Sequence, residues 1–192
     1  MAGVASPMLR RNRSSFTRFF VGLAIGHVAA AALIALLLSL VGSLLAGVVP
    51  LTGRLVVAST VAIGFGVADL LNRTPHVWRQ VPQRFIDILQ PGTLGTIWGF
   101  DLGLLVTTQK TTSLLWTALP AIALLEPSHT LAAFVGFSLV WIAATFVGSL
   151  KPWATQVSSK LGRRWQRPLR IVTGVLLIAA AVESLATATL FR

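Results

Sequence analysis

The chain has 192 residues, of which 55% are hydrophobic and only 11% are charged, and it carries a formal net charge of +11. A soluble domain with this composition would have too little polar surface to cover its core, so the composition excludes an ordinary soluble protein and indicates an integral membrane protein. The chain has no cysteine. This excludes thiol and disulfide chemistry and any thiolate metal site.

Five apolar segments follow one another along the chain, and a membrane-spanning helix needs about 20 residues. The second, fourth and fifth segments have about this length. The first and third are longer, so each is either a long tilted helix or a broken helix with a re-entrant piece. We therefore expect an all-α, polytopic transmembrane bundle of about five spans. The segments cover residues 19–49, 52–71, 94–125, 130–150 and 171–191.

Basic residues form three clusters, before the first segment, after the second, and between the fourth and fifth. With single spans throughout, all three lie on one side of the membrane, which the positive-inside rule makes cytoplasmic. We expect a multi-pass protein of a bacterial inner membrane with a cytoplasmic N-terminus, whose clusters face anionic lipid headgroups, and no nucleic-acid partner. The clusters are Arg10, Arg11, Arg13 and Arg18; Arg73, Arg79 and Arg84; and Lys151, Lys160, Arg163, Arg164, Arg167 and Arg170.

The first half of the chain is echoed in the second half, 77 residues later. The shift places Gly22 on Gly99 and Gly26 on Gly103. Each Gly-x-x-x-Gly pair lets helix backbones approach closely, so we expect the first and third segments to cross there and the two repeats to superpose by a rotation about the membrane normal. We predict one integral membrane domain over 1–192, made of a basic cytoplasmic N-terminus (1–18), repeat 1 (19–76), an interfacial loop (77–95), repeat 2 (96–153), a basic cytoplasmic loop (154–170) and a final helix (171–192).

Ionisable side chains inside apolar segments cost about 2.5–3.5 kcal/mol near the bilayer centre unless they are paired or hydrated, so they are functional candidates. Asp101 and Lys110 lie on opposite faces of a regular helix and can pair only if the third segment breaks between Thr107 and Thr112. In an unbroken helix, Asp101 lies at the cytoplasmic interface and Lys110 snorkels toward it. The candidates for a substrate or ion pathway are Asp101, Lys110, Thr111, Thr112, Glu183 and His27.

Glu183 lies about eight residues from the outer end of the fifth segment, too deep for its short side chain to reach the interface. We expect it to face the bundle and to pair with Lys110 or His27, or to be protonated. His27 is more typical of a hydrogen-bonded packing residue than of a ligand, since no second histidine lies at helical spacing, and we expect no metal and no cofactor. Asp69, at the end of the second segment, reads as an interfacial residue.

A resemblance to known membrane proteins rests on Gly22–Gly26, Gly99–Gly103 and the loop Trp78-Arg-Gln-Val-Pro82. Over roughly residues 19–150 the chain resembles the transmembrane region of the cytochrome c biogenesis and DsbD-type electron carriers, and the wider LysE-type exporter group. The electron carriers use a cysteine in each half, which this chain lacks, and members tend to have six spans. The resemblance therefore implies neither their redox activity nor any functional residue.

These features predict a small permease-like or transporter-like protein for a small solute or ion, with a site between the first, third and fifth segments. The alternative is a non-catalytic subunit or assembly factor of a larger membrane complex, bound through Gly-rich and Trp-rich faces to a membrane protein partner or to another copy of the chain. An enzyme is not expected, because the sequence has no P-loop, no Rossmann fingerprint, no His-Glu-x-x-His and no nucleophile elbow.

Overall fold

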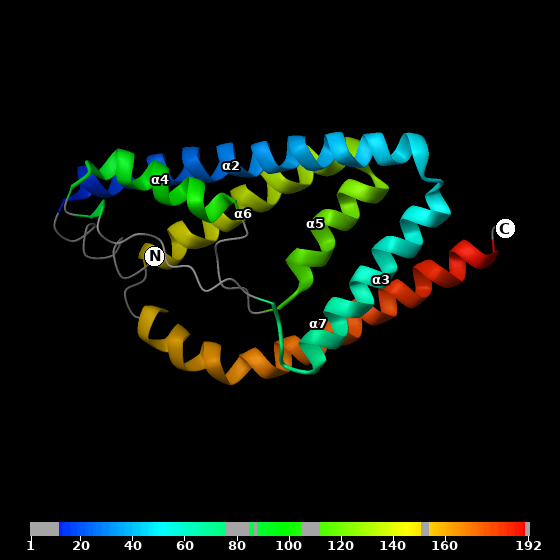
Figure 1. Cartoon of the computed structure of the whole chain (residues 1–192). Helices are drawn as coiled ribbons and strands as arrows, with labels where there is room; N and C mark the ends of the chain where they lie inside the picture. The colour runs from blue at the N-terminus through cyan, green and yellow to red at the C-terminus, as the bar shows by residue number, and fades with distance from the viewer. Residues whose placement is uncertain (1–11, 76–84, 87, 105–111, 151–153, 191–192) are drawn as a thin grey trace. The chain divides into compact units, whose positions relative to one another are not determined.

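The computed structural model of the chain describes residues 12–75, 85–86, 88–104, 112–150 and 154–190 (Figure 1). Within these ranges the regular elements are all helical, so the chain is all-α, as the sequence predicts. The elements are α2 (Arg13–Val48), α3 (Leu51–Leu70), α4 (Pro91–Gly103), α5 (Leu114–Leu125), the short 3₁₀ helix η2 (Pro127–His129), α6 (Thr130–Leu150) and α7 (Ala154–Leu190).

Four helical stretches in the described part of the chain are long and apolar enough to cross a membrane. Many of their leucine, isoleucine and valine side chains are exposed, as those of lipid-facing helices are. The chain is therefore a multi-pass membrane protein. The stretches are Arg13–Val48, Leu51–Leu70, Pro127–Leu150 and Trp165–Thr189.

The two long apolar segments fold differently. The first lies within one continuous helix, α2, whose start is capped by the Asn12 side chain, which accepts the Ser14 N–H at 3.0 Å. The third forms two short helices, because α4 ends at Gly103 and α5 begins only at Leu114. Leu104, after α4, and Thr112 and Ser113, before α5, are not helical, and the break expected between Thr107 and Thr112 falls almost wholly outside the described residues. Residues 19–48 thus lie in one helix, and the described part of 94–125 lies in two, which agrees with the unbroken alternative for the first segment and the broken one for the third.

The basic segment 154–170, which the sequence leads us to expect as a loop, is part of α7. Its lysine, arginine and glutamine residues are good helix formers, so the helix continues from this polar stretch into the apolar one without a break. Pro168 lies inside α7 and removes one hydrogen bond without ending the helix. Hydropathy separates the two stretches, but it carries no information on whether the backbone is continuous.

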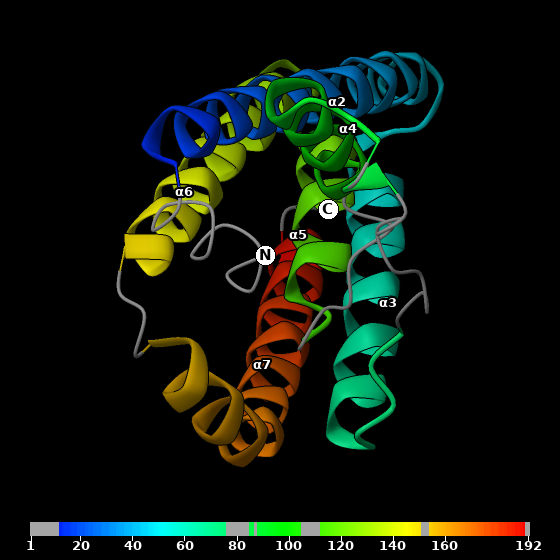
Figure 2. The same cartoon turned by 90° about the vertical axis from the view of Figure 1, so that its left-hand side faces the viewer.

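The helices form two compact units. Unit 1 comprises Met1–Ile34, Val77–Gln109 and Phe134–Gly162, and unit 2 comprises Ala35–His76, Lys110–Ala133 and Arg163–Arg192, so α2, α6 and α7 contribute to both. In unit 1, α4 lies along the first half of α2 (Figures 1 and 2). Seven buried side chains of these two helices form its core: Phe16, Phe19, Phe20, Leu23, Leu94, Trp98 and Leu102.

In unit 2, α3 packs against α5 and α7, and the three helices lie side by side in both views (Figures 1 and 2). Gly66 of α3 and Gly174 of α7 face each other so closely that a Cβ atom on Gly174 would lie 2.7 Å from the Gly66 carbonyl oxygen. Small residues at this contact let two membrane helices approach closely without a large apolar core.

Candidate functional site

The four glycines predicted to pack helices together lie at the contact between α2 and α4 in unit 1: Gly22, Gly26, Gly99 and Gly103. A Cβ atom on Gly22 would overlap the Gly92 carbonyl oxygen, and one on Gly99 would overlap the carbonyl oxygen of Leu23. Residue numbers rise together along the two helices at this contact, so α4 runs parallel to α2. These positions shape unit 1 and carry no chemistry of their own.

His27 and Asp101 are both buried in unit 1. The Nδ1 atom of His27 lies 2.9 Å from the Ser138 hydroxyl oxygen, and its ring stacks on Trp141 with the centroids 4.4 Å apart. Asp101 lies on α4, within one turn of its last residue. The hydrogen bond and the stacked ring give His27 a packing environment that joins α2 to α6.

The other pathway candidates are Lys110 and Thr111, which lie outside the described residues, and Thr112 and Glu183 of unit 2. Thr112 is half-buried just before the start of α5. Glu183 is exposed on α7, although the sequence leads us to expect it inside the bundle. The next residue, Ser184, lines a cavity instead, and one residue step turns a helix by about 100°, which carries Glu183 away from that face.

A cavity of about 180 Å³ lies in unit 2 between α3, α5 and α7. Its wall consists of alanine and leucine side chains and three hydroxyl groups, with no charged residue among them. The volume is close to that of a cavity of about 150 Å³ that binds benzene in another protein. The cavity can therefore hold a small molecule. Because no lining residue is charged, the cavity has no group that would neutralise a charged ligand.

Each of the three helices contributes one hydroxyl to the cavity, from Ser59, Thr117 and Ser184. Thr117 donates to the Ser113 carbonyl at 3.1 Å and Ser184 to the Ala180 carbonyl at 2.8 Å, so both hydroxyl oxygens can still accept a hydrogen bond. Ser59 is only 3% exposed, and its hydroxyl makes no hydrogen bond within the part of the chain that the structure describes. Since this hydroxyl faces the cavity, it can donate a hydrogen bond to a polar ligand there.

At one end of α3, the fully buried carboxylate of Asp69 binds two other segments of unit 2. Its Oδ1 atom accepts the Thr74 hydroxyl at 2.6 Å and the Ser113 hydroxyl at 2.8 Å, and its Oδ2 atom accepts the Ser113 N–H at 2.8 Å. Ser113 directly precedes α5, so the carboxylate lies at the positive end of that helix. These three residues, the Asp69 cluster, tie the end of α3 to the start of α5.

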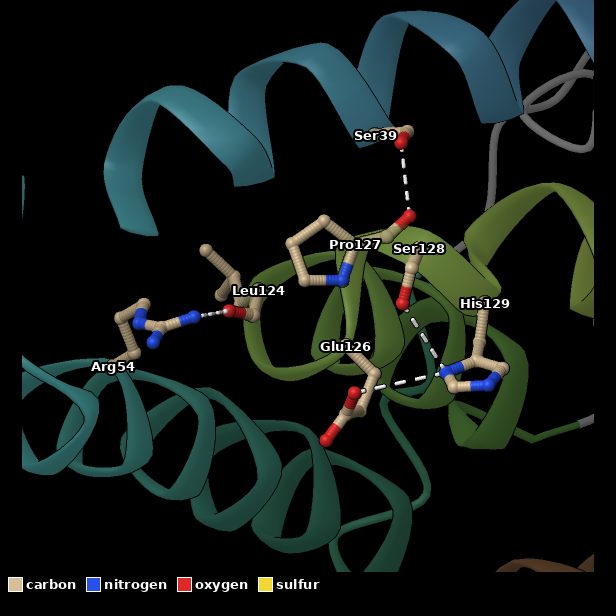
Figure 3. Close-up of polar contacts among 7 residues, drawn as sticks. All are labelled: Ser39, Arg54, Leu124, Glu126, Pro127, Ser128 and His129. Atoms are coloured by element: carbon tan, nitrogen blue, oxygen red, sulfur yellow. Dashed lines mark hydrogen bonds and ion pairs between the residues drawn. The ribbon is translucent and has the colours of Figure 1, made fainter. Parts of the chain in front are cut away.

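At the other end of α3, Arg54 holds the last turn of α5 (Figure 3). Its Nη1 atom donates to the Leu124 carbonyl at 2.9 Å, one of the terminal carbonyls that have no partner within their own helix. Close by, the Ser39 hydroxyl of α2 donates to the Pro127 carbonyl at 2.8 Å. Polar contacts thus secure α5 at both of its ends.

The two halves of α5 are supported differently. Pro120 lies inside the helix and cannot donate to the carbonyl one turn earlier, which makes this the position where the helix bends most easily. After it, the backbone packs directly on α2, where a Cβ atom on Gly42 would overlap the Ala123 carbonyl oxygen. Before it, the Asp69 cluster anchors the first residues of the helix.

Four residues of unit 2 that shape the cavity and secure α5 do not stand out in the amino-acid sequence: Ser59, Asp69, Ser113 and Arg54. Ser113 stands directly before an apolar run, which is a helix N-cap signature and could have located the start of α5. No sequence signal pairs Asp69 with a residue 44 positions later, because that contact depends on the antiparallel packing of α3 and α5.

The chain matches no protein-family model, no curated protein and no solved structure. Among the described residues, no three histidine, aspartate or glutamate side chains lie close enough together to hold a metal ion.

Proposed function

We propose that the chain is a small permease whose substrate site is the cavity between α3, α5 and α7. The observation that carries this proposal is the hydroxyl of Ser59, a residue that is only 3% exposed, which faces a cavity that receives one hydroxyl from each of three helices. A structural bundle would fill this space with leucine and satisfy the serine on its own helix. The resemblance of the sequence to LysE-type exporters is in line with a transport role.

The substrate class follows from the lining. A cavity of about 180 Å³ is smaller than the roughly 300–1,000 Å³ of sites for drug-sized ligands, so the solute has few non-hydrogen atoms. The wall offers hydroxyl groups and no charge, and a bare ion would lose its hydration without compensation. The sequence leaves open whether a small solute or an ion is transported. The lining of this cavity favours a small, uncharged polar solute.

The moving element in this proposal is the first half of α5. Release of Ser113 from Asp69 lets this half bend away from α3 at Pro120, which widens the cavity at that end. The second half stays on α2 at Gly42 and on Arg54. Reformation of the Asp69 cluster returns this half of α5 to α3 and narrows the cavity again.

Solute permeation into proteoliposomes tests the proposal. Purified protein is reconstituted, and re-swelling after a hyperosmotic step is followed by light scattering with urea, glycerol and other small uncharged polar solutes. We expect at least one solute to enter faster than it enters protein-free vesicles. Ala121→Phe, which fills the cavity, should return that rate to the protein-free value.

Gly64→Phe is the matched control, because Gly64 is exposed on α3 and a Cβ atom there meets nothing within 4 Å. This variant should permeate solute like the wild type, and circular dichroism verifies that both variants are folded. Equal permeation in Ala121→Phe and the wild type, or no solute entering faster than into empty vesicles, would overturn the proposal.

We also propose the finer membrane arrangement expected from the sequence, with five crossings, a duplication and a cytoplasmic N-terminus in a bacterial inner membrane. α4 and α5 have 13 and 12 residues, each too short to cross alone, so this arrangement assigns the remaining crossing to the whole segment 94–125. The 77-residue shift relates Val48, the end of α2, to Leu125, the end of α5. This correspondence supports α4 and α5 as the broken counterpart of α2.

One observation favours the alternative function, a non-catalytic subunit of a larger membrane complex. Glu183 is exposed within a span, whereas intramembrane acids usually face a bundle interior or a water-filled cavity. A partner helix with a basic residue would cover it. If Glu183→Gln abolishes a complex seen on native gels and solute permeation is absent, the subunit function replaces the permease.

A further inference from the structure

A second hollow, of about 840 Å³, lies on unit 1 between the start of α2 and the end of α6. Three of its lining residues are aromatic, Phe16 and Phe20 from α2 and Phe146 from α6. The rings of Phe20 and Phe146 meet edge to face with centroids 5.1 Å apart, which holds the two helices at a fixed separation. Arg13 stands at one end of this groove and Ala24 at the other.

The groove has the length of one lipid leaflet. Arg13 and Ala24 are eleven residues apart on a continuous helix, which is about 16 Å at 1.5 Å per residue. The hydrocarbon core of a bilayer is about 30 Å thick, so the length of the groove is about the thickness of one leaflet. A single acyl chain has about this extent.

The charge lies at the end where a headgroup would be. The Arg13 side chain is exposed, and it forms no hydrogen bond or ion pair in the part of the chain that the structure describes. The adjoining Thr17 hydroxyl donates to the backbone carbonyl of Arg13 at 3.0 Å. A guanidinium binds a phosphate through two parallel N–H donors.

We propose that this groove is a specific site for an anionic phospholipid, with one acyl chain against the phenylalanine wall and the phosphate on Arg13. Annular lipid covers every exposed face of a membrane helix without specific contacts. A specific lipid site differs in having both a groove for the acyl chain and a fixed positive charge near the headgroups. The site is separate from the solute cavity of unit 2, so neither proposal depends on the other.

Native mass spectrometry of the protein in detergent, titrated with phosphatidylglycerol or phosphatidylcholine, tests the site. We expect the wild type to bind one phosphatidylglycerol several-fold more tightly than phosphatidylcholine. Arg13→Gln should weaken phosphatidylglycerol binding about fivefold, since one basic residue at an anionic surface contributes ~1 kcal/mol, and should leave phosphatidylcholine unchanged. Arg18→Gln is the matched control, because Arg18 is exposed on the same helix but does not line the groove.

The apolar part of the site is tested separately. Ala24→Trp fills the inner end of the groove and should weaken both lipids, whereas Ile25→Trp, at a 60% exposed position outside the groove, should weaken neither. Equal binding of the two lipids by the wild type, or equal effects of Arg13→Gln and Arg18→Gln, would show that no specific headgroup site exists. Equal effects of Ala24→Trp and Ile25→Trp would remove the acyl-chain groove.

Discussion

The carboxylate of Asp69 accepts hydrogen bonds from both the backbone N–H and the hydroxyl of Ser113, each at 2.8 Å. This pair joins the last turn of α3 to the residue that begins α5, and it is fully buried. It is a strong connection at one end of a short helix that contains a proline. The proposed opening of the cavity depends on its release.

Loss of the Asp69 carboxylate should destabilise the protein. Asp69→Ala leaves one N–H and two hydroxyls buried without their acceptor, and we expect the free energy of unfolding to fall by about 3 kcal/mol. Ser113→Ala removes only the hydroxyl and should cost about 1 kcal/mol. Thermal unfolding in detergent measures both. Glu126→Ala is the control, because its contact with His129 at 3.6 Å is exposed and should contribute less than about 0.5 kcal/mol (Figure 3). Equal melting temperatures for Asp69→Ala and Glu126→Ala would contradict the cluster's role.

A methyl group at Gly99 should separate α2 from α4. Gly99→Ala places a Cβ atom on the Leu23 carbonyl oxygen, and we expect a loss of at least about 2 kcal/mol in the free energy of unfolding, since neither backbone can move cheaply. Gly136→Ala is the matched substitution at a helix position where a Cβ atom meets nothing within 4 Å. It should be neutral or stabilising by up to about 1 kcal/mol, because alanine is the better helix former. Equal free energies of unfolding for the two variants would refute the close packing of α2 on α4.

Arg54 should hold the end of α5 through its hydrogen bond to the Leu124 carbonyl. Arg54→Met keeps much of the apolar stem but leaves the carbonyl without its donor, which should cost about 1.5–3 kcal/mol. Arg54→Lys retains the charge with a different geometry and should recover part of this loss. Chemical denaturation in mixed micelles ranks the three proteins, and the contact is excluded if Arg54→Met is as stable as the wild type.

The sequence was sufficient for the fold class and for the apolar stretches, because hydropathy over about 20 residues reports directly on membrane insertion. It also located the glycines at the α2–α4 contact, since Gly22 and Gly99 repeat at a constant offset. Helix continuity could not be predicted in the same way. A 32-residue apolar segment can be one helix or two, and the sequence left both alternatives open for 94–125.

The candidate site was harder to predict, because a search for ionisable residues within apolar segments selects residues that do not line the cavity. Glu183 is conspicuous in the sequence but exposed in the structure, whereas the cavity beside it is lined by alanine, leucine and hydroxyl side chains, which are common in any membrane helix. Asp69 reads as an interfacial residue because it stands at the end of an apolar stretch. Its burial depends on Thr74 and Ser113, and the second of these becomes its neighbour only through the tertiary fold.

The absence of cysteine makes the topology directly measurable. Single cysteines replace Ser14, at the start of α2, and Ser128, in η2 between α5 and α6. A membrane-impermeant maleimide added to intact cells should label Ser128→Cys, and it should label Ser14→Cys only after the membrane is disrupted. Labelling of Ser14→Cys in intact cells would reverse the orientation derived from the basic clusters.

The most direct test of the account is the water accessibility of a thiol in the cavity. Ser59→Cys places the thiol where the buried hydroxyl now lies, and Gly64→Cys places one on the exposed apolar side of the same helix. A thiol reacts as its thiolate, which forms in water and not in hydrocarbon. With a small, uncharged, water-soluble methanethiosulfonate in proteoliposomes, we predict rapid modification of Ser59→Cys, slowed by a transported solute, and little modification of Gly64→Cys. A Ser59→Cys thiol as unreactive as that of Gly64→Cys would contradict the claim that the cavity is a solute site.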